Sequence, residues 1–256
     1  MATDWKKYGF LFEELVKRDF KNLYRGAVLG VVWSVLSPLL TLLVMRLVFT
    51  QFFGHSIDHY TTFLFCGTLA FSFFSDCTSQ GMFTLRSNVQ IYSRVNMPRY
   101  IFLLSKNTQL LCNFALTMCV FLVFCLLDSV AVTPRFLLLL YPILCMVVFN
   151  IGLGLFLAVL LVLFRDIQYL WNVIVRLLMY LSAVFYNVNS YPPLIQRVFL
   201  LNPVYCFIRY FRQVVLDGVT PSLEFHLLIL AYTLAALALG CGIYWKFKDS
   251  YLSYFE

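Results

Sequence analysis

Six apolar stretches constrain the fold of this chain more than any other feature of its sequence. A helix needs about 20 predominantly apolar residues to cross the hydrocarbon core of a bilayer, and each stretch comes close to that length or exceeds it. They cover residues 27–50, 61–82, 105–127, 136–164, 167–186 and 227–245. Because hydrophobic residues are 62% and charged residues 12% of the chain, we predict an all-α polytopic membrane protein with six transmembrane helices.

The lysines and arginines predict how these spans are oriented. They gather before the first span, between the second and third, after the fourth and after the sixth, whereas residues 51–60 contain neither Lys nor Arg. Because basic residues concentrate in cytoplasmic loops, we expect both termini in the cytoplasm. The net charge of +7 then reflects membrane topology and not nucleic-acid binding.

The segment before the first span predicts an amphipathic helix. Glu13, Glu14, Lys17, Arg18 and Lys21 share one face, and the other carries apolar residues at three- and four-residue spacing: Leu11, Phe12, Leu15, Val16, Phe20 and Leu23. Such a helix can lie at the headgroup level with its basic side toward anionic lipid. A surface helix of a soluble domain is the alternative, but the apolar spans that follow leave no room for such a domain.

Two connections differ from simple loops. Residues 85–99 mix apolar and basic side chains before Pro98 and predict a short cytoplasmic surface helix that proline ends. Residues 187–226 are too apolar for a solvated loop and too short to span, so we expect two outer re-entrant helices broken at Asn202-Pro203. An outer loop resting on the membrane surface is the alternative.

We therefore expect one transmembrane domain with four parts. They are the interface helix (1–26), spans one to five (27–186), the outer segment (187–226), and span six with its cytoplasmic tail (227–256). Pro38, Pro142, Gly152 and Gly154 lie within the spans. They predict helix kinks or close helix approach.

Charged and aromatic residues inside the spans are candidates for lining a polar path. A charge near the bilayer centre costs about 2.5 to 3.5 kcal/mol on insertion scales, so Asp76 and Arg176 should face protein or water. They either line the path of a polar cargo or bond within the subunit. Aromatic rings could stack on sugar faces, although most aromatics in membrane proteins anchor or pack. The candidates are Trp33, Phe73, Phe74, Tyr169, Trp171, Tyr180 and Tyr186.

Cysteine and histidine placement argues against a disulfide framework and a metal site. Seven of the eight cysteines fall inside predicted spans and no C-x-x-C pair occurs, so they are interpreted as small apolar packing residues. His55 and His59 have the spacing of a metal pair on a helix, with Asp58 beside them. They lie in a short outer loop without further ligands, so a solvated loop is the preferred interpretation and no metal is expected.

The order of several short motifs resembles the transmembrane permeases of bacterial ABC exporters for lipid-linked polysaccharides, of the O-antigen and wall teichoic acid type. The resemblance covers essentially the whole chain. One departure is Met97, where the family more often has phenylalanine before the proline. The motifs are Arg18-Asp19, Tyr24-Arg25-Gly26, Leu29-Gly30 before Trp33, Ser37-Pro38, Asn88 through Met97-Pro98, Arg165-Asp166-Ile167, Leu201-Asn202-Pro203, Arg209-Tyr210 and Arg212.

This resemblance implies a transport subunit of the bacterial cytoplasmic membrane that is not itself an enzyme. Two copies would form the conduit, and two copies of a separate ATPase subunit would bind ATP and Mg²⁺, because no G-x-x-x-x-G-K-[ST] phosphate loop occurs here. The implied coupling helix, which docks on the ATPase, contains Asn88, Ile91, Tyr92, Arg94, Val95 and Pro98. The implied interface helix contains Phe12, Lys17, Arg18, Asp19, Lys21 and Arg25.

Two alternatives to polysaccharide export remain open from the sequence. One is an ABC permease for drugs or small lipids. The other is an intramembrane enzyme that transfers a lipid-linked glycan, which would usually need paired carboxylates or a metal site near the interface. The acids of this chain are scattered, and the adjacent pair Glu13-Glu14 falls on the amphipathic helix, so the enzyme is the less favoured of the two.

Overall fold

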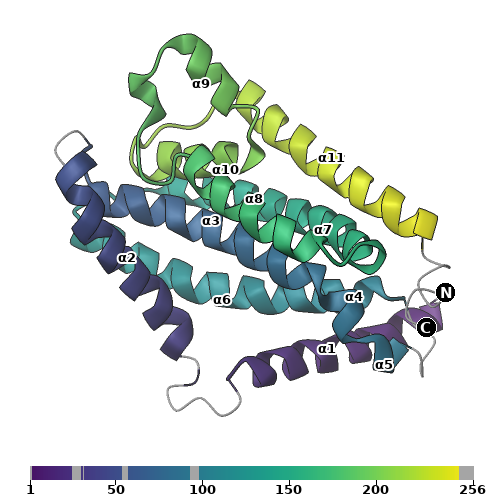
Figure 1. Ribbon diagram of the computed structural model, residues 1–256. Helices are drawn as coiled ribbons and strands as arrows, with labels where there is room; N and C mark the ends of the chain where they lie inside the picture. The colour runs from purple at the N-terminus through teal and green to yellow at the C-terminus, as the bar shows by residue number, and fades with distance from the viewer. Residues whose placement is uncertain (1, 25–29, 31, 54–56, 93–97, 248–256) are drawn as a thin grey trace.

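The computed structural model describes residues 2–24, 30, 32–53, 57–92 and 98–247, and within these ranges the regular structure is entirely helical (Figure 1). Four helical segments are long and apolar enough to cross a membrane. They are α2 (Val32–Phe53), α6 (Tyr100–Leu127), the continuous pair η1 (Pro134–Leu139) and α7 (Leu140–Leu163), and α11 (Leu223–Phe247). The fold is therefore that of an all-helical chain with four candidate transmembrane helices.

The other two expected spans correspond to α3 (Tyr60–Met82) and α8 (Ile167–Leu181). Serine, threonine, glutamine and Asp76 make the second half of α3 too polar for a typical span. Helix α8 has 15 residues, which at 1.5 Å per residue is about 22 Å, less than the roughly 30 Å hydrocarbon core. The predicted end at Tyr186 was too late, because Ala183 adopts a left-handed backbone with φ 51° that ends the helix.

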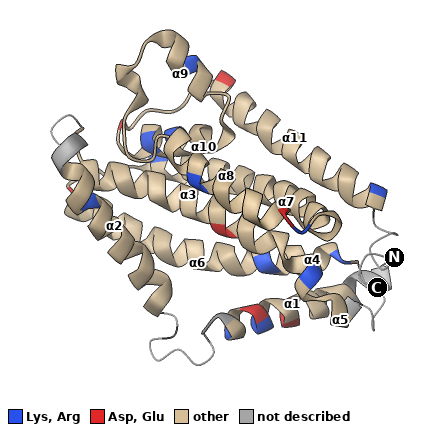
Figure 2. Ribbon diagram, in the orientation of Figure 1, with Lys and Arg blue, Asp and Glu red and all other residues tan. Residues whose placement is uncertain are grey.

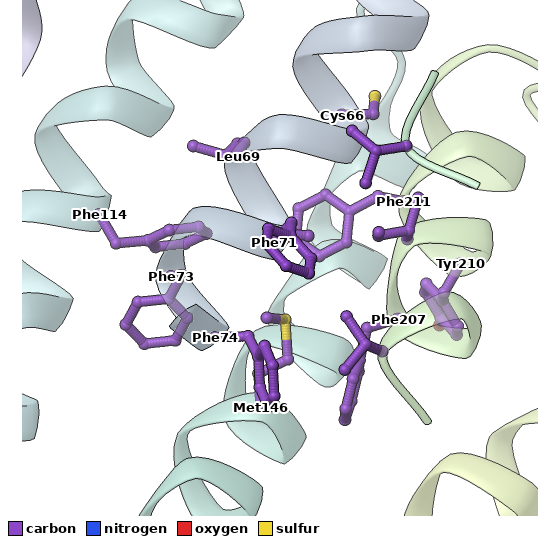
Figure 3. Close-up of a cluster of buried hydrophobic side chains, with 14 of the residues drawn as sticks. Cys66, Leu69, Phe71, Phe73, Phe74, Phe114, Met146, Phe207, Tyr210 and Phe211 are labelled. Atoms are coloured by element: carbon purple, nitrogen blue, oxygen red, sulfur yellow. The ribbon is translucent and has the colours of Figure 1, made fainter. Parts of the chain in front are cut away.

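Helix α3 lies at the centre of the molecule. It contacts α2, α6, α7, α8 and α10 (Pro203–Val215), and most of its side chains are buried. Figure 3 shows the aromatic cluster that results, with rings from α3 and α10 facing Met146 of α7. The Phe74 ring packs 6.2 Å, centroid to centroid, from both Phe149 and Trp171. Ring–ring packing around the central helix α3 therefore forms much of the core.

Helices α7 and α11 approach more closely than any side chain would permit. A Cβ atom added at Gly240 would lie 2.0 Å from the carbonyl oxygen of Gly152, and one added at Gly152 would lie 2.5 Å from the carbonyl of Ala236. Small residues allow this backbone contact, which is a common way to join helices in a membrane. The close approach predicted at Gly152 is confirmed.

Different helices lie at the two ends of the helical bundle (Figure 1). At one end lie α1 (Ala2–Tyr24), the short helices α4 (Thr84–Ser87) and α5 (Val89–Tyr92), and the C-terminal end of α11. At the other end lie η2 (Val188–Ser190), α9 (Pro193–Phe199) and α10. Figure 2 shows that charged residues gather toward these two ends and are sparse along the middle of the helices.

Helices α9 and α10 separate at Asn202, where the sequence predicted a break. The Asn202 side-chain oxygen accepts hydrogen bonds from the backbone N–H groups of Val204 and Tyr205, and Pro203 occupies the first helical position. Asparagine as N-cap followed by proline is a strong helix start signal. All eight cysteines are free; five are buried, as expected of packing residues, whereas Cys112 and Cys119 are exposed on α6.

Candidate functional site

The interface and coupling segments predicted from the sequence meet at one apolar cluster, which we call the α1–α6 junction. Leu15 of α1 and Ile101 and Phe102 of α6 are buried there. Phe12 of α1 and Ile91 of α5 pack against them, together with Tyr8, Leu11 and Val89. Two segments about 75 residues apart in the chain therefore share a single support at the start of α6.

A charged network joins α1 to α6 beside this cluster. The Arg18 guanidinium donates to Asp19 through Nε at 3.0 Å and Nη2 at 2.7 Å. The Ser105 hydroxyl of α6 donates to the other Asp19 oxygen at 2.9 Å. The Asp19 side chain is only 12% exposed, so its charge needs these partners. The Arg-Asp pair of the sequence motif thus attaches α1 to the membrane-spanning helix.

The outer face of α1 carries a solvated set of charges. Lys17 pairs with Glu13 at 2.8 Å and with Glu14 at 3.2 Å. The hydrogen bond from Lys17 lowers the pKa of Glu13, and the bond to Glu13 raises the pKa of Lys17. Lys21 is also exposed. These groups remain available to lipid headgroups or to a protein partner.

The predicted coupling residues have different environments. Asn88 is buried, and its side-chain amide donates to the Thr84 carbonyl at 2.8 Å and the Ser87 hydroxyl at 3.2 Å. It shapes the turn between α4 and α5 and offers little to a partner. Pro98 is half-buried and accepts from the Ile101 N–H at 3.2 Å. Tyr92 belongs to α5; Arg94, Val95 and Arg25 lie outside the described residues.

A second feature is a cavity of about 440 Å³ between α2, α3 and α6, with Met179 of α8 at its edge, which we call the polar groove. It brings together three of the residues predicted from the sequence: Trp33, Phe73 and Asp76. The Phe73 ring lies 4.6 Å from that of Phe114, centroid to centroid (Figure 3). Asp76 is exposed toward this space, and no ion pair to it occurs among the described residues.

Ser72 and Ser75, which lie near Asp76 in the second predicted span and were candidates for the same polar path, also line the groove. The sequence did not point to the other polar groups of the lining, which are Ser34, Ser37, Thr41, Thr68, Asn113 and Thr117. A signal was present, because Ser37 and Thr41 are four residues apart, as are Thr68 and Ser72, and so share a helix face. The groove thus offers hydroxyl and amide groups beside aromatic rings within a mostly apolar bundle.

The predicted residues of α8 lie on a surface stripe and do not line the groove. Tyr169 and Tyr180 are 67% and 58% exposed, and Arg176 between them is exposed as well. Their spacing of seven and four residues places them on one helix face. Tyr186 is half-buried and its hydroxyl donates to the Tyr180 carbonyl at 2.9 Å.

Phe74 belongs to the core and not to a conduit surface. Its side chain is 2% exposed and enclosed by the rings of Phe71, Phe149 and Trp171. The prediction failed because Phe73 and Phe74 are adjacent and project from different faces of α3. Only the face toward α2 and α6 opens onto the groove.

No group of three potential metal ligands occurs in the part of the chain that the structure describes. The His59 Nδ1 atom lies 3.9 Å from an oxygen of Asp128, which in turn accepts from the Thr62 hydroxyl at 2.6 Å. His55, the other histidine of the predicted spacing, lies outside the described residues. The histidine and its neighbours therefore form a local polar cluster at the start of α3.

Comparison with known proteins finds relatives that match nearly the whole chain. The chain is 25% identical over 255 residues to the O-antigen export system permease protein RfbA of Myxococcus xanthus, covering 98% of this chain and 97% of that protein. It is 26% identical over 246 residues to the RfbA protein of Klebsiella pneumoniae, covering 94% of each. It is 20% identical over 245 residues to the polysialic acid transport protein KpsM of Escherichia coli, covering 94% and 95%.

A protein-family model also matches most of the chain. The model of the ABC-2 type transporter family matches residues 11–216. That range contains the α1–α6 junction, the polar groove and α10. Because the match covers well over half of the sequence, the chain belongs to the ABC-2 type transporter membrane family.

Proposed function

We propose that this chain is the permease subunit of an ATP-driven exporter that moves a lipid-linked polysaccharide across the bacterial cytoplasmic membrane. The polar groove is the single observation that carries the proposal. An ionisable side chain and many hydroxyl groups are expensive within a membrane unless they serve a polar cargo or bond to one another. The relatives are named for the export of O-antigen or the transport of polysialic acid. These names favour a glycan as the cargo.

The groove has the chemistry that a moving glycan needs. Hydroxyl and amide groups exchange hydrogen bonds with sugar hydroxyls at small net cost, and the exposed Trp33 side chain offers a ring face. Weak, replaceable contacts allow a polymer to slide. Tight binding at any one point would stop it. The drug or small-lipid permease is less well supported, because the relatives that match nearly the whole chain are named for O-antigen and polysialic acid.

The conduit in this proposal forms between two copies of the chain. The exposed stripe of α8, with Tyr169, Arg176 and Tyr180, has no partner helix within the described subunit. A large part of α2, including Leu43 and Leu47, is also exposed. Facing copies of α2 and α8 would close the two grooves into one passage. This arrangement uses six membrane passes, including α3 and α8, with α9 and α10 re-entering from the outer side.

A separate ATPase subunit supplies the energy in this proposal. The docking surface in this proposal includes α5 and the exposed face of α1. Both helices pack on the start of α6, so a push from the ATPase would be transmitted directly to a helix that lines the groove. Tyr92→Ala and Arg94→Glu should each reduce co-purification of the ATPase. The matched control is Arg197→Glu, because Arg197 is exposed on α9, at the end of the bundle opposite α1 and α5.

The decisive experiment measures ATP hydrolysis by the complex in lipid nanodiscs, with and without the lipid-linked glycan made by the same cells. We expect the glycan to stimulate ATP hydrolysis by the wild-type complex. The Asp76→Leu complex should still assemble but lose this stimulation. A complex that responds only to small amphiphiles would favour drug or lipid efflux. Glycan transfer to another lipid without ATP would favour the enzyme alternative.

A further inference from the structure

A second cavity, of about 640 Å³, lies at the end of the bundle opposite α1, and we call it the outer pocket. Its volume falls in the range of small-ligand sites, roughly 300 to 1,000 Å³. The start of α3, the η2 turn and α10 form its walls. Polar side chains dominate the lining: Asp58, Asn187, Asn189, Arg209, Gln213 and Asp217. None of these residues belongs to the polar groove or to the α1–α6 junction.

Arg212 gives the outer pocket a rigid wall. Its side chain is only 8% exposed. Nη1 donates to the Ala183 carbonyl at 2.8 Å, Nη2 donates to the Val184 carbonyl at 2.7 Å, and the guanidinium carbon lies 3.4 Å from the Phe63 ring centroid. This one side chain therefore joins α10 to the turn after α8 and to α3. The carbonyl partners fix the arginine without neutralising its charge.

Gly67 makes room for this arginine. A Cβ atom added at Gly67 would lie 2.8 Å from Nη2 of Arg212 and 3.0 Å from the Val184 carbonyl oxygen. Any larger residue at this position would displace the guanidinium from the site where it holds the turn. The wall of the pocket is thus preorganised by two residues that contact each other across α3 and α10.

Polar atoms at the pocket remain without partners in the described part of the chain. The Gln213 side-chain oxygen and the Arg212 Nε atom are buried and have no hydrogen bond. Asp58 and Asp217 form no ion pair with described residues, and the Arg209 guanidinium carbon lies 5.7 Å from the centroid of the Phe225 ring without an ion-pair partner among these residues. Buried polar groups are nearly always paired, and an exception needs an explanation such as a ligand or a functional role.

The lining matches a sugar better than an anion or an apolar molecule. Each sugar hydroxyl donates and accepts a hydrogen bond, and the pocket supplies both kinds of partner: Arg209 donates, Asp58 and Asp217 accept, and Asn and Gln amides do both. A phosphate group would meet the two carboxylates as well as the two arginines, so the charges offset one another and favour a neutral polar ligand.

We infer that the outer pocket is a carbohydrate-binding subsite that receives a sugar unit of the exported glycan on the outer side of the membrane. The inference rests on the proposed function. Such a site would favour forward movement, because a sugar held at the exit makes return of the chain into the groove less frequent. Its walls come from α10 and from the turns that flank α3 and α8, so it can form within one subunit.

The test uses the complete complex of this chain with its ATPase in lipid nanodiscs. The probe is the water-soluble polysaccharide released by mild acid from the lipid-linked glycan of the producing cells. Saturation-transfer difference NMR reports its binding. Gln213→Leu removes the unpaired oxygen while keeping side-chain volume. Gln109→Leu is the matched control, because Gln109 of α6 is also buried with unpaired amide atoms and does not line the pocket.

We expect the wild type and Gln109→Leu to bind the polysaccharide equally and Gln213→Leu to bind it about 3- to 10-fold more weakly, as loss of one hydrogen bond implies. Three results would overturn the inference. They are equal binding by all three proteins, absence of saturation transfer from the wild-type complex to the polysaccharide, and displacement of the polysaccharide by inorganic phosphate. Surface export of the glycan in cells with and without this gene is measured in parallel. Export that is independent of the gene would refute the proposed function; gene-dependent export without binding would refute only the subsite.

Discussion

The contact between Gly240 and Gly152 makes a sharp quantitative prediction for Gly240→Ala. The new Cβ would lie 2.0 Å from the Gly152 carbonyl oxygen, where real Cβ atoms essentially never approach within 3.0 Å. Helices α7 and α11 would have to separate by about 1 Å, the difference between these distances. Overpacking of this kind costs about 1 to 3 kcal/mol. A backbone carbonyl cannot rotate away as a side chain does, so the upper part of that range is expected.

The measurement is the thermal unfolding of the purified complex in nanodiscs. One kcal/mol shifts Tm by roughly 2 to 4 °C for a chain of this size, so a cost of about 2 to 3 kcal/mol in Gly240→Ala should lower Tm by about 4 to 12 °C. Gly242→Ala is the control on the same helix, because a Cβ there meets nothing within 4 Å. This control should be neutral or slightly stabilising, since alanine favours helix over glycine. If the two variants unfold at the same temperature, the close-contact argument is refuted.

Three further predictions concern the sites. Asp19→Ala should free α1 from α6 at a cost of about 1.5 to 3 kcal/mol for a hydrogen bond to a charged group, seen as faster proteolysis within α1; unchanged proteolysis relative to Glu14→Ala would contradict the junction. Arg212→Lys should lower Tm nearly as much as Arg212→Ala, because an ammonium group does not reproduce the planar fork; full retention of Tm by Arg212→Lys would disprove a bidentate role. Asp76→Asn should keep more glycan export than Asp76→Leu, because an amide still exchanges hydrogen bonds with sugars; equal export by both variants would remove Asp76 from the lining.

Several features followed from local sequence patterns. The apolar runs predicted a helical membrane protein, and the spacing of apolar residues predicted α1. The break at Asn202-Pro203 followed from capping chemistry, which acts within a few residues. These predictions needed no knowledge of what packs against what, because bilayer thickness and local hydrogen bonding impose them.

Other predictions failed where the environment of a side chain depends on distant elements. Phe73 and Phe74 are adjacent aromatics of one type, yet only Phe73 lines the polar groove. The fifth predicted span ends at Leu181 and not at Tyr186, because Arg212, about 30 residues later, holds the Ala183 and Val184 carbonyls in a turn. Periodicity cannot reveal such long-range partners.

Local sequence patterns suffice to establish that this chain is helical, that it enters a membrane, and where its charges and helix breaks lie, because hydropathy and capping are local properties. Which polar residues meet depends instead on how the helices pack. This packing joins Asp19 to Ser105 and supports α1 and α5 on a common cluster. The outer pocket is likewise formed by three segments that are separate in the sequence: the start of α3, the η2 turn and α10. Burial and pairing arise from packing between elements distant in the chain, and therefore the sites became visible only in three dimensions.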